Sequence, residues 1–246
     1  METLERVGRR IRAGASVTVL TGAGVSAPSG VPTFRGDDGL WRRYRPEVLA
    51  TPEAFARDPR LVWAWYDWRR RRIAGCEPNA AHRVLAAWSH RLPRFTLVTQ
   101  NVDGLHERAG TRNVIRFHGT LWQLRCAGRC PGSPAAWPDD RVPLPELPPR
   151  CPWCGGLARP DVVWFGEPIE PGIMDAALAA LACDVFLAIG TSAVVQPAAS
   201  LLGEARRHGA FVVEINVEGT PATALADAVL RGSADDILPR LDAYLD

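Results

Sequence analysis

Four cysteines in the middle of the chain have the spacing of a metal site. Cys126 and Cys130 form one pair, and Cys151 and Cys154 follow as a second pair after 20 residues. Four thiolates in two pairs suit tetrahedral zinc, and the segment between them has too little periodicity to build its own core. Because all four ligands are sulfur, no coordination position stays open, and the spacing predicts one structural Zn2+ ion. Four buried or redox-active cysteines are the alternative, which the paired spacing disfavours.

A short glycine loop near the start of the chain has the pattern of a phosphate-binding turn. Gly22, Gly24 and Ala27 directly follow an apolar, β-branched run, as in the Gly/Ala form of the dinucleotide fingerprint. Glycines let the backbone approach a pyrophosphate, and a following helix points N–H groups at the anion. The alternative is a plain strand-to-helix turn. A standard dehydrogenase has an acidic residue after the next strand, about 20 residues on; none is found there, which disfavours hydride transfer.

Polar side chains suited to acid–base chemistry follow two other strand signals. Gln100, Asn101 and Asp103 come after one such run, and His118 comes after the next. In doubly wound folds ligands bind outside the carboxyl ends of the strands, so we expect these groups to meet near the glycine loop. An imidazole titrates near neutral pH, which makes His118 a candidate general base, although a lone histidine is more often structural.

The elements that must position these residues alternate along the chain. Short apolar runs predict buried strands, and apolar residues at helical spacing predict helices between several of them. The predicted strands are residues 17–20, 95–99, 114–117, 185–189 and 211–215, and the predicted helices are 4–13, 80–89, 172–182 and 197–208. The alternation predicts an α/β fold with a doubly wound, Rossmann-like parallel sheet.

Two segments interrupt this alternation and are expected to form a smaller lobe. Residues 37–77 are rich in Trp, Tyr and Arg and predict a helical insert, whereas residues 124–159 are rich in Pro, Cys and Gly and predict the zinc-binding module. The Rossmann-like lobe then comprises residues 1–36, 78–123 and 160–246 of a single domain spanning 1–246. Small-molecule sites tend to lie in clefts between such lobes.

Composition excludes several classes of protein. The 246 residues are 47% hydrophobic and 23% charged, which excludes wholesale disorder, and 29 basic against 27 acidic side chains disfavour a protein that grips nucleic acid. Residues 1–12 lack the apolar stretch of a signal peptide, and the charge-free run 185–203 contains polar residues and a proline. We therefore expect a cytoplasmic monomer with no membrane contact and no specific nucleic-acid partner.

Together these motifs resemble the sirtuins, the NAD-dependent protein lysine deacylases. Motifs in family order cover nearly the whole chain: Gly22-Ala23-Gly24-Val25-Ser26, Pro32-Thr33-Phe34-Arg35, Thr99-Gln100-Asn101-Val102-Asp103, Phe117-His118-Gly119, the four cysteines, Val163-Trp164-Phe165-Gly166-Glu167 and Gly190-Thr191-Ser192. This combination is far more specific than the glycine loop alone. The chain departs from the pattern in its first cysteine pair, which is separated by three residues rather than the commoner two.

The resemblance implies a site for NAD as co-substrate. The implied NAD contacts are Gly22, Ala23, Gly24, Ser26, Phe34, Arg35, Gln100, Asn101, Asp103, Gly190, Thr191, Ser192, Asn216, Glu218 and Ala234. Phe34 and Arg35 match a mobile loop of the family, and Asn216 and Glu218 would take over the ribose contacts that the missing acidic residue makes elsewhere.

The resemblance also implies a mechanism, with Asn101 and His118 as catalytic residues. The acyl oxygen of the modified lysine attacks the ribose carbon as nicotinamide leaves. His118 then acts as general base on a ribose hydroxyl, which attacks the resulting imidate. The implied products are nicotinamide, free lysine and O-acyl-ADP-ribose. Acylated-lysine proteins would be the partners, their backbone pairing with Val163, Phe165, Gly166 and Glu167 by edge-strand addition.

Tyr66 and Arg69 bear on the acyl group that is removed. Three residues apart on a helix, they share one face, where a phenol beside a guanidinium can bind a carboxylate. Spacing alone fits a solvated basic face equally well, and we expect the adjoining arginines 70–72 to be solvated. The pair is, however, similar to the signature of sirtuins that remove succinyl, malonyl and glutaryl groups, and Ala50 matches their small residue beside a longer acyl chain.

The sequence thus predicts an NAD-dependent lysine deacylase that removes succinyl- or malonyl-type and acetyl groups. Three alternatives stay open at this point. One is a mono-ADP-ribosyltransferase that uses the same NAD site with another acceptor. The second is a plain deacetylase without a preference for acidic acyl groups. The third is a non-catalytic NAD-binding scaffold, which would need neither His118 nor Asn101.

Overall fold

A six-stranded parallel sheet forms the larger lobe of the protein. The computed structural model describes residues 2–12, 14–32 and 46–245. The strand order is β3-β2-β1-β7-β8-β9, and all pairings are parallel. The strands are β1 (Val17–Thr21), β2 (Phe95–Thr99), β3 (Val114–Arg116), β7 (Val185–Ile189), β8 (Phe211–Asn216) and β9 (Ala228–Arg231). This order is that of a doubly wound fold, which confirms the predicted fold class.

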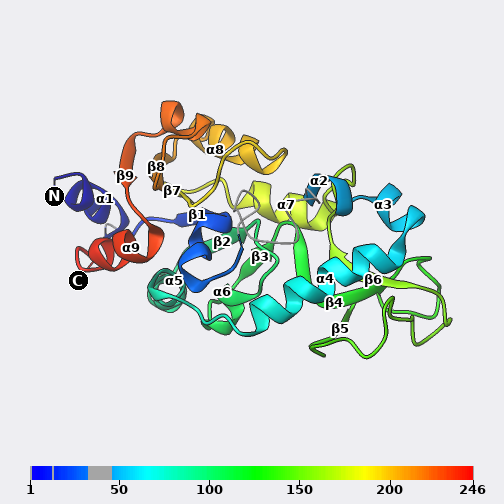
Figure 1. Ribbon diagram of the computed structural model, residues 1–246. Helices are drawn as coiled ribbons and strands as arrows, with labels where there is room; N and C mark the ends of the chain where they lie inside the picture. Colours follow the sequence, from blue (N-terminus) through cyan, green and yellow to red (C-terminus); the bar gives the residue numbers. More distant parts are fainter. Residues whose placement is uncertain (1, 13, 33–45, 246) are drawn as a thin grey trace.

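Helices cover both faces of this sheet (Figure 1). On one side lie α1 (Glu2–Arg12), α5 (Ala80–Arg91) and α9 (Ala234–Asp242), and on the other α7 (Pro171–Ala179) and α8 (Ala198–Arg207). Strand β7 serves both layers because side chains alternate along a strand. Leu187 and Ile189 pack toward the α1–α5–α9 layer, and Phe186 and Ala188 toward the α7–α8 layer. A strand that is buried on both faces has a continuous apolar sequence, and β7 was predicted from this pattern.

A second, antiparallel sheet forms the core of the smaller lobe, to the right in Figure 1. Its order is β5-β4-β6, with β4 (Gly119–Cys126), β5 (Trp137–Pro138) and β6 (Ala158–Val162). The sequence did not indicate this sheet, and the expected lobe boundaries at 123/124 and 159/160 fall inside β4 and β6. The pairing of β4 with β6 is irregular, and Pro160 interrupts the alternation that would have indicated a strand.

The helical insert packs on this second sheet. Within the described part of residues 37–77 lie α2 (Pro46–Leu49), α3 (Pro52–Arg57) and α4 (Pro59–Ala74). Helix α4 begins at a favourable N-cap, since the Asp58 carboxylate accepts from the Leu61 N–H and proline occupies the first helical position. Its buried apolar residues share one cluster with residues of β4 and β6.

Arg70 on α4 corrects one expectation. The sequence placed it on a solvated face, but the side chain is buried and its Nη2 lies 2.9 Å from Oδ1 of Asp139 in the smaller lobe. The Arg70 guanidinium also lies 5.3 Å from the centre of the Trp122 ring. A run of arginines does not reveal which member points inward, because that depends on the position of Asp139, 69 residues away.

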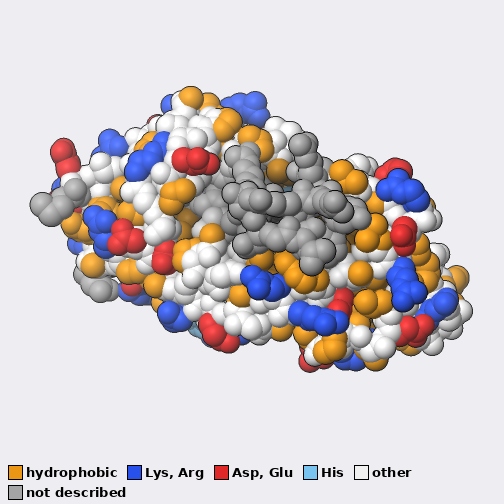
Figure 2. Space-filling model, viewed as in Figure 1, with side chains coloured by type: hydrophobic (Ala, Val, Ile, Leu, Met, Phe, Trp, Pro, Cys, Tyr) orange, Lys and Arg blue, Asp and Glu red, His pale blue; other side chains and the backbone are white. Residues whose placement is uncertain are grey.

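The remaining described elements are short: η1 (Ala23–Val25), η2 (Ala27–Ser29), α6 (Leu105–Arg108) and η4 (Pro221–Leu225). None of the helices in the described ranges is long and apolar enough to cross a bilayer. On the face shown in Figure 2, basic and acidic side chains are interspersed, in keeping with the balanced composition.

Candidate cofactor and catalytic site

The glycine loop lies at the switch point of the sheet. From β1 the chain goes to β2 and β3 on one side, while β7, β8 and β9 lie on the other, so the loops after β1 and β7 meet. The Gly24 N–H donates to the Gly190 carbonyl at 2.8 Å. A Cβ on Gly24 would lie 2.8 Å from Gly190 Cα, and one on Gly22 would lie 2.7 Å from Thr191 Cα. The glycines therefore allow two loops to pack tightly at the edge where a ligand is expected.

The loop continues into two 3-10 turns, η1 and η2, within the residues described up to Val31 and Pro32. The sequence analysis expected a helix after this loop. Pro28 lies at the start of η2, and Gly30 ends it with φ of 83°, a left-handed conformation that stops a helix. Phe34 and Arg35, both predicted NAD contacts, lie outside the described residues.

Amide side chains from neighbouring strand ends connect the loops. The Asn101 Nδ2 donates to the Gly22 carbonyl at 3.1 Å and to Ser26 Oγ at 3.2 Å. The Gln100 Nε2 donates to Thr191 Oγ1 at 2.9 Å, and the Asn216 Nδ2 donates to the Thr191 carbonyl at 2.9 Å. Residues at the carboxyl ends of β1, β2, β7 and β8 thus meet at one edge of the sheet, where the sequence placed them.

Three other predicted NAD contacts lie along the same edge. Ser192 is half-buried directly after Thr191, and Glu218 is exposed beyond the end of β8. Ala234 is buried at the start of α9, whose residues contact η1. The Glu218 carbonyl accepts from Arg231, whereas its carboxylate extends into solvent.

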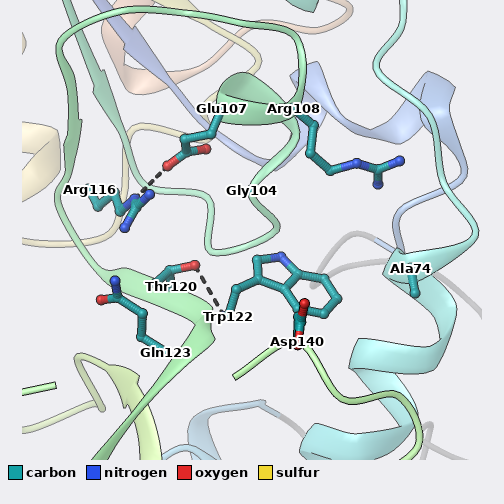
Figure 3. A pocket seen from close by; sticks show the side chains of 9 residues that line it. All are labelled: Ala74, Gly104, Glu107, Arg108, Arg116, Thr120, Trp122, Gln123 and Asp140. Atoms are coloured by element: carbon teal, nitrogen blue, oxygen red, sulfur yellow. Dashed lines mark hydrogen bonds and ion pairs between the residues drawn. The ribbon is translucent and has the colours of Figure 1, made fainter. Parts of the chain in front are cut away.

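Asp103 lies in a turn whose backbone is held by the side chain of Trp122. The Asp103 carboxylate is buried and accepts from the Leu105 N–H at 2.9 Å, and burial raises its pKa. The Trp122 indole donates to the Asp103 carbonyl at 2.6 Å, and its ring lies against Gly104, where a Cβ would approach to 2.7 Å. Figure 3 shows this ring between α6 and the end of α4, lining a cavity of about 370 Å³. No pattern in the sequence indicated this position for Trp122.

His118 has the geometry of a base. Its Nδ1 lies 3.2 Å from the Gln100 carbonyl, which can only accept, so the proton is on Nδ1 and Nε2 keeps its lone pair. Burial lowers the pKa of His118, and the hydrogen bond to Gln100 offsets part of this effect. The imidazole is therefore neutral at pH 7, the form that accepts a proton.

The residues around His118 join it to the smaller lobe. The His118 carbonyl accepts from the Val163 N–H at 3.0 Å, directly after β6. Gly119, the next residue, has φ of 79°, and a Cβ there would lie 2.1 Å from the Asp161 carbonyl oxygen. Only glycine lets β4 pass so close to β6 immediately after the histidine. The predicted base and the predicted peptide-binding segment are thus neighbours.

Two buried histidines that the sequence analysis did not consider lie beneath this edge. The His82 Nε2 lies 3.3 Å from Ser26 Oγ, and the His106 Nε2 lies 3.0 Å from Thr21 Oγ1. Their rings are 4.8 Å apart. Since Ser26 also accepts from Asn101, the polar network reaches a predicted catalytic residue. The sequence does not indicate that the two histidines are neighbours, because they lie on different helices, α5 and α6.

This network predicts a loss of stability in acid. Burial lowers the pKa of His82 to about 4 and that of His106 well below 6.5, so the unfolded chain binds more protons as the pH falls below 6.5. Stability therefore rises with pH between about 4 and 6.5, and His82 alone removes about 2 kcal/mol between pH 7 and pH 5. Urea unfolding at pH 7 and pH 5 measures this change in the free energy of unfolding. The substitution His82→Gln is expected to reduce the change, and His208→Gln, at an exposed position, is the control. An equal pH dependence in all three proteins would contradict the assignment.

Tyr66 and Arg69 lie on α4 facing the same region. Tyr66 is buried and its hydroxyl oxygen accepts from the Trp164 indole at 2.8 Å. Arg69 is half-buried, with its guanidinium 5.0 Å from the centre of the Trp65 ring. Burial lowers the pKa of Arg69, which the neighbouring Tyr66 and Asp103 partly counteract. The Arg69 guanidinium is thus within electrostatic range of both the Tyr66 phenol and the Asp103 carboxylate.

The segment 163–167 follows β6 and turns at Phe165 and Gly166, where the Glu167 N–H donates to the Trp164 carbonyl at 3.0 Å. The Phe165 N–H donates to the Ala50 carbonyl at 2.9 Å, and the Phe165 ring is 40% exposed. Gly166 has φ of 85°. The Glu167 carboxylate accepts from Arg159 at 2.6 and 2.8 Å, so this side chain is already bound within the protein.

The four cysteines lie together as predicted. Their sulfur atoms are all within 4.8 Å of one another. Cys126 and Cys154 sulfurs are 3.7 Å apart, and those of Cys130 and Cys151 are 3.8 Å apart. Zn–S bonds of about 2.3 Å place the sulfurs of a tetrahedron about 3.8 Å apart, so this arrangement fits one zinc ion. The four thiolates would hold it and leave no open position, which makes its contribution structural.

Comparison with known proteins decides the family. A profile of the Sir2 family matches residues 22–197. The chain is 48% identical over 231 residues to an NAD-dependent protein deacylase of Aquifex aeolicus, which covers 94% of this chain and 95% of the relative. The chain belongs to the Sir2 family. An NAD-dependent protein deacylase 2 of Pyrobaculum aerophilum is 53% identical over 224 residues, covering 91% and 88% of the two chains.

Solved Sir2 structures have the same fold. A Sir2 homologue in complex with NAD superposes with a TM-score of 0.89 at 46% identity, covering 98% of this chain and 95% of that one. Another Sir2 structure, with a deacetylated peptide and 3′-O-acetyl ADP-ribose, gives a TM-score of 0.84 at 26% identity and covers 98% of both chains. The resemblance to sirtuins that the motifs indicated is confirmed.

Proposed function

We infer that this Sir2 chain is an NAD-dependent protein lysine deacylase, and we propose that it removes acidic acyl groups as well as acetyl. One observation carries the activity: His118 is bonded through Nδ1 to the Gln100 carbonyl and through its own carbonyl to the Val163 N–H, so it joins the glycine-loop edge to the segment 163–167. Bound NAD supplies the ribose carbon that accepts the acyl oxygen when nicotinamide leaves. The residues proposed to hold it are Gly22, Ala23, Gly24, Ser26, Phe34, Arg35, Gln100, Asn101, Asp103, Gly190, Thr191, Ser192, Asn216, Glu218 and Ala234.

In the proposed mechanism His118 takes a proton from a ribose hydroxyl through Nε2. The hydrogen bond from Nδ1 to the Gln100 carbonyl orients the ring, and the same carbonyl stabilises the imidazolium that forms. Asn101 is held by Gly22 and Ser26 through its amide nitrogen, and in this proposal its amide oxygen contacts the ligand. The acyl-lysine backbone would pair with Val163, Phe165, Gly166 and Glu167 through their main chain.

The acidic-acyl preference rests on Tyr66 and Arg69. A phenol and a guanidinium on one helix face, in a partly dehydrated setting, bind a carboxylate far better than in water. Ala50, whose carbonyl is bound to Phe165, provides a small side chain near the same segment. A succinyl or malonyl group would place its carboxylate between the phenol and the guanidinium, and an acetyl group would leave them uncontacted.

Product analysis tests the proposal. Matched acetyl-lysine and succinyl-lysine peptides are incubated with and without NAD and analysed by mass spectrometry. NAD-dependent loss of succinyl with formation of O-succinyl-ADP-ribose is the expected result. Loss of acetyl alone would overturn the acidic-acyl proposal, and transfer of ADP-ribose to protein without any acylated lysine would indicate a transferase instead.

Substitution of Arg69 by methionine is predicted to separate the two activities. The substitution removes the charge but keeps the apolar contacts, so kcat/KM for the succinyl peptide falls about 10–100-fold, the worth of a hydrogen bond to a charged group. Activity on the acetyl peptide changes less than threefold. Arg72→Met, at an exposed position on the same helix, is the matched control. An equal loss on both peptides would show that Arg69 has no part in acyl selection.

A further inference from the structure

A hydrogen bond between two buried side chains links helix α4 to the segment 163–167. The Trp164 Nε1 lies 2.8 Å from the Tyr66 hydroxyl oxygen, and both side chains are buried. An indole N–H can only donate, so the Tyr66 oxygen must accept in this bond. The one proton of the phenol is therefore not used by Trp164 and points elsewhere.

Trp164 is held in its orientation from several sides. Its backbone N–H donates to Glu167 Oε2 at 2.9 Å. The Arg159 guanidinium lies 3.3 Å from the centre of the indole ring, and the Phe55 ring lies 5.1 Å from it. Arg159 is itself fixed by its two hydrogen bonds to Glu167. Rotation of the indole would break this set of contacts, so the direction of its N–H is fixed.

The phenol stays protonated under all ordinary conditions. Burial raises the pKa of Tyr66 to about 12, against the opposing charge of Arg69. A buried hydroxyl that accepts on one side satisfies its donor only if an acceptor lies on another side. Arg69 lies next to it on the same helix face, so an anionic oxygen placed between them would receive one hydrogen bond from each.

We propose that Trp164 is a positioning residue for acidic acyl groups: its indole N–H, by donating to the Tyr66 oxygen, directs the phenolic O–H toward the acyl carboxylate. The proposal rests on the proposed desuccinylase function and adds a residue to it. Trp164 lies between Val163 and Phe165, so one short segment pairs with the substrate backbone and also orients the group that reads the acyl chain.

The test is Trp164→Phe, measured on matched succinyl and acetyl peptides. Loss of the N–H frees the phenol to rotate, so KM for the succinyl peptide is expected to rise about tenfold with kcat nearly unchanged. Kinetic constants for the acetyl peptide stay within twofold. Trp153→Phe, at a 47% exposed tryptophan of the smaller lobe, is the control and leaves both peptides unaffected.

A double-mutant cycle with Tyr66→Phe distinguishes positioning from general support. If Trp164 acts through the phenol, Trp164→Phe has less than a twofold further effect on the succinyl peptide once the hydroxyl is absent. If the effects of Trp164→Phe and Tyr66→Phe on the succinyl peptide multiply in the double variant, the proposal is overturned. It is also overturned if Trp164→Phe alone lowers activity equally on the succinyl and acetyl peptides. Where Trp164→Phe does not fold, benzothienylalanine at position 164 keeps the shape of the indole and removes only the N–H. If the unaltered protein removes no succinyl group, it is the proposed function that fails.

Discussion

Replacing His118 by alanine is expected to lower kcat for every acyl peptide by about 10²–10⁴-fold, the contribution of a positioned general base. The imidazole is the only proposed group that takes the ribose proton, and its Nδ1 is already committed to Gln100. Because the base is proposed to act after nicotinamide leaves, release of nicotinamide in a single turnover is retained while O-acyl-ADP-ribose is not formed. Steady-state assays and single-turnover product analysis measure the two effects.

The pH profile provides an independent readout for the same residue. Burial lowers the pKa of His118 below 6.5, so the base stays unprotonated and kcat, which contains the proposed proton transfer, falls only at a pH below that value. In His118→Ala the residual activity lacks this fall. His208→Ala, at an exposed histidine, is the control and keeps both rate and profile. Retention of more than a tenth of kcat in His118→Ala would remove the histidine from its proposed role.

The sequence predicted those parts of the fold that depend on neighbouring residues. The strands β1, β2, β7 and β8 are mostly apolar and β-branched, because helices cover both faces of the sheet, and this local signal does not depend on the partner strand. The predicted ligand edge followed from one rule about parallel strands, and Gln100, Asn101 and His118 lie there. The cysteine pairs are equally local signals.

Features that depend on distant partners were not predictable in this way. Arg70 is buried because it forms an ion pair with Asp139, which is distant in the sequence. The pairing of β4 with β6 contains Pro160 and a register shift, neither of which a strand pattern predicts. His82 and His106 are 24 positions apart and become neighbours only when α5 and α6 pack. Trp164 lies inside a motif that was noted, but its role depends on Tyr66, 98 residues earlier.

Removal of zinc is expected to unfold the smaller lobe and leave the larger sheet folded. In small zinc domains about 10 kcal/mol of zinc-binding free energy is folding free energy. Here Cys126 is the last residue of β4, and Cys151 and Cys154 precede β6. Cys151→Ser is predicted to lose the metal, as measured by elemental analysis, and to show an early, separate unfolding transition in calorimetry. Cys183→Ala, outside the cluster, is the control and keeps one zinc per chain.

Activity is expected to be lost with the metal even though the zinc site has no open position for chemistry. The cysteines hold the far ends of β4 and β6, and the near ends of these strands carry His118 and Val163, which are joined by a 3.0 Å hydrogen bond. Loosening this sheet separates the base from the peptide-binding segment, so deacylation falls more than tenfold while NAD binding, held by the larger sheet, changes little. Calorimetric titration of zinc-free protein with NAD measures the NAD affinity, and the deacylase assay on the same protein measures the activity. Zinc-free protein with full deacylase activity would mean that the sheet keeps its shape without the ion.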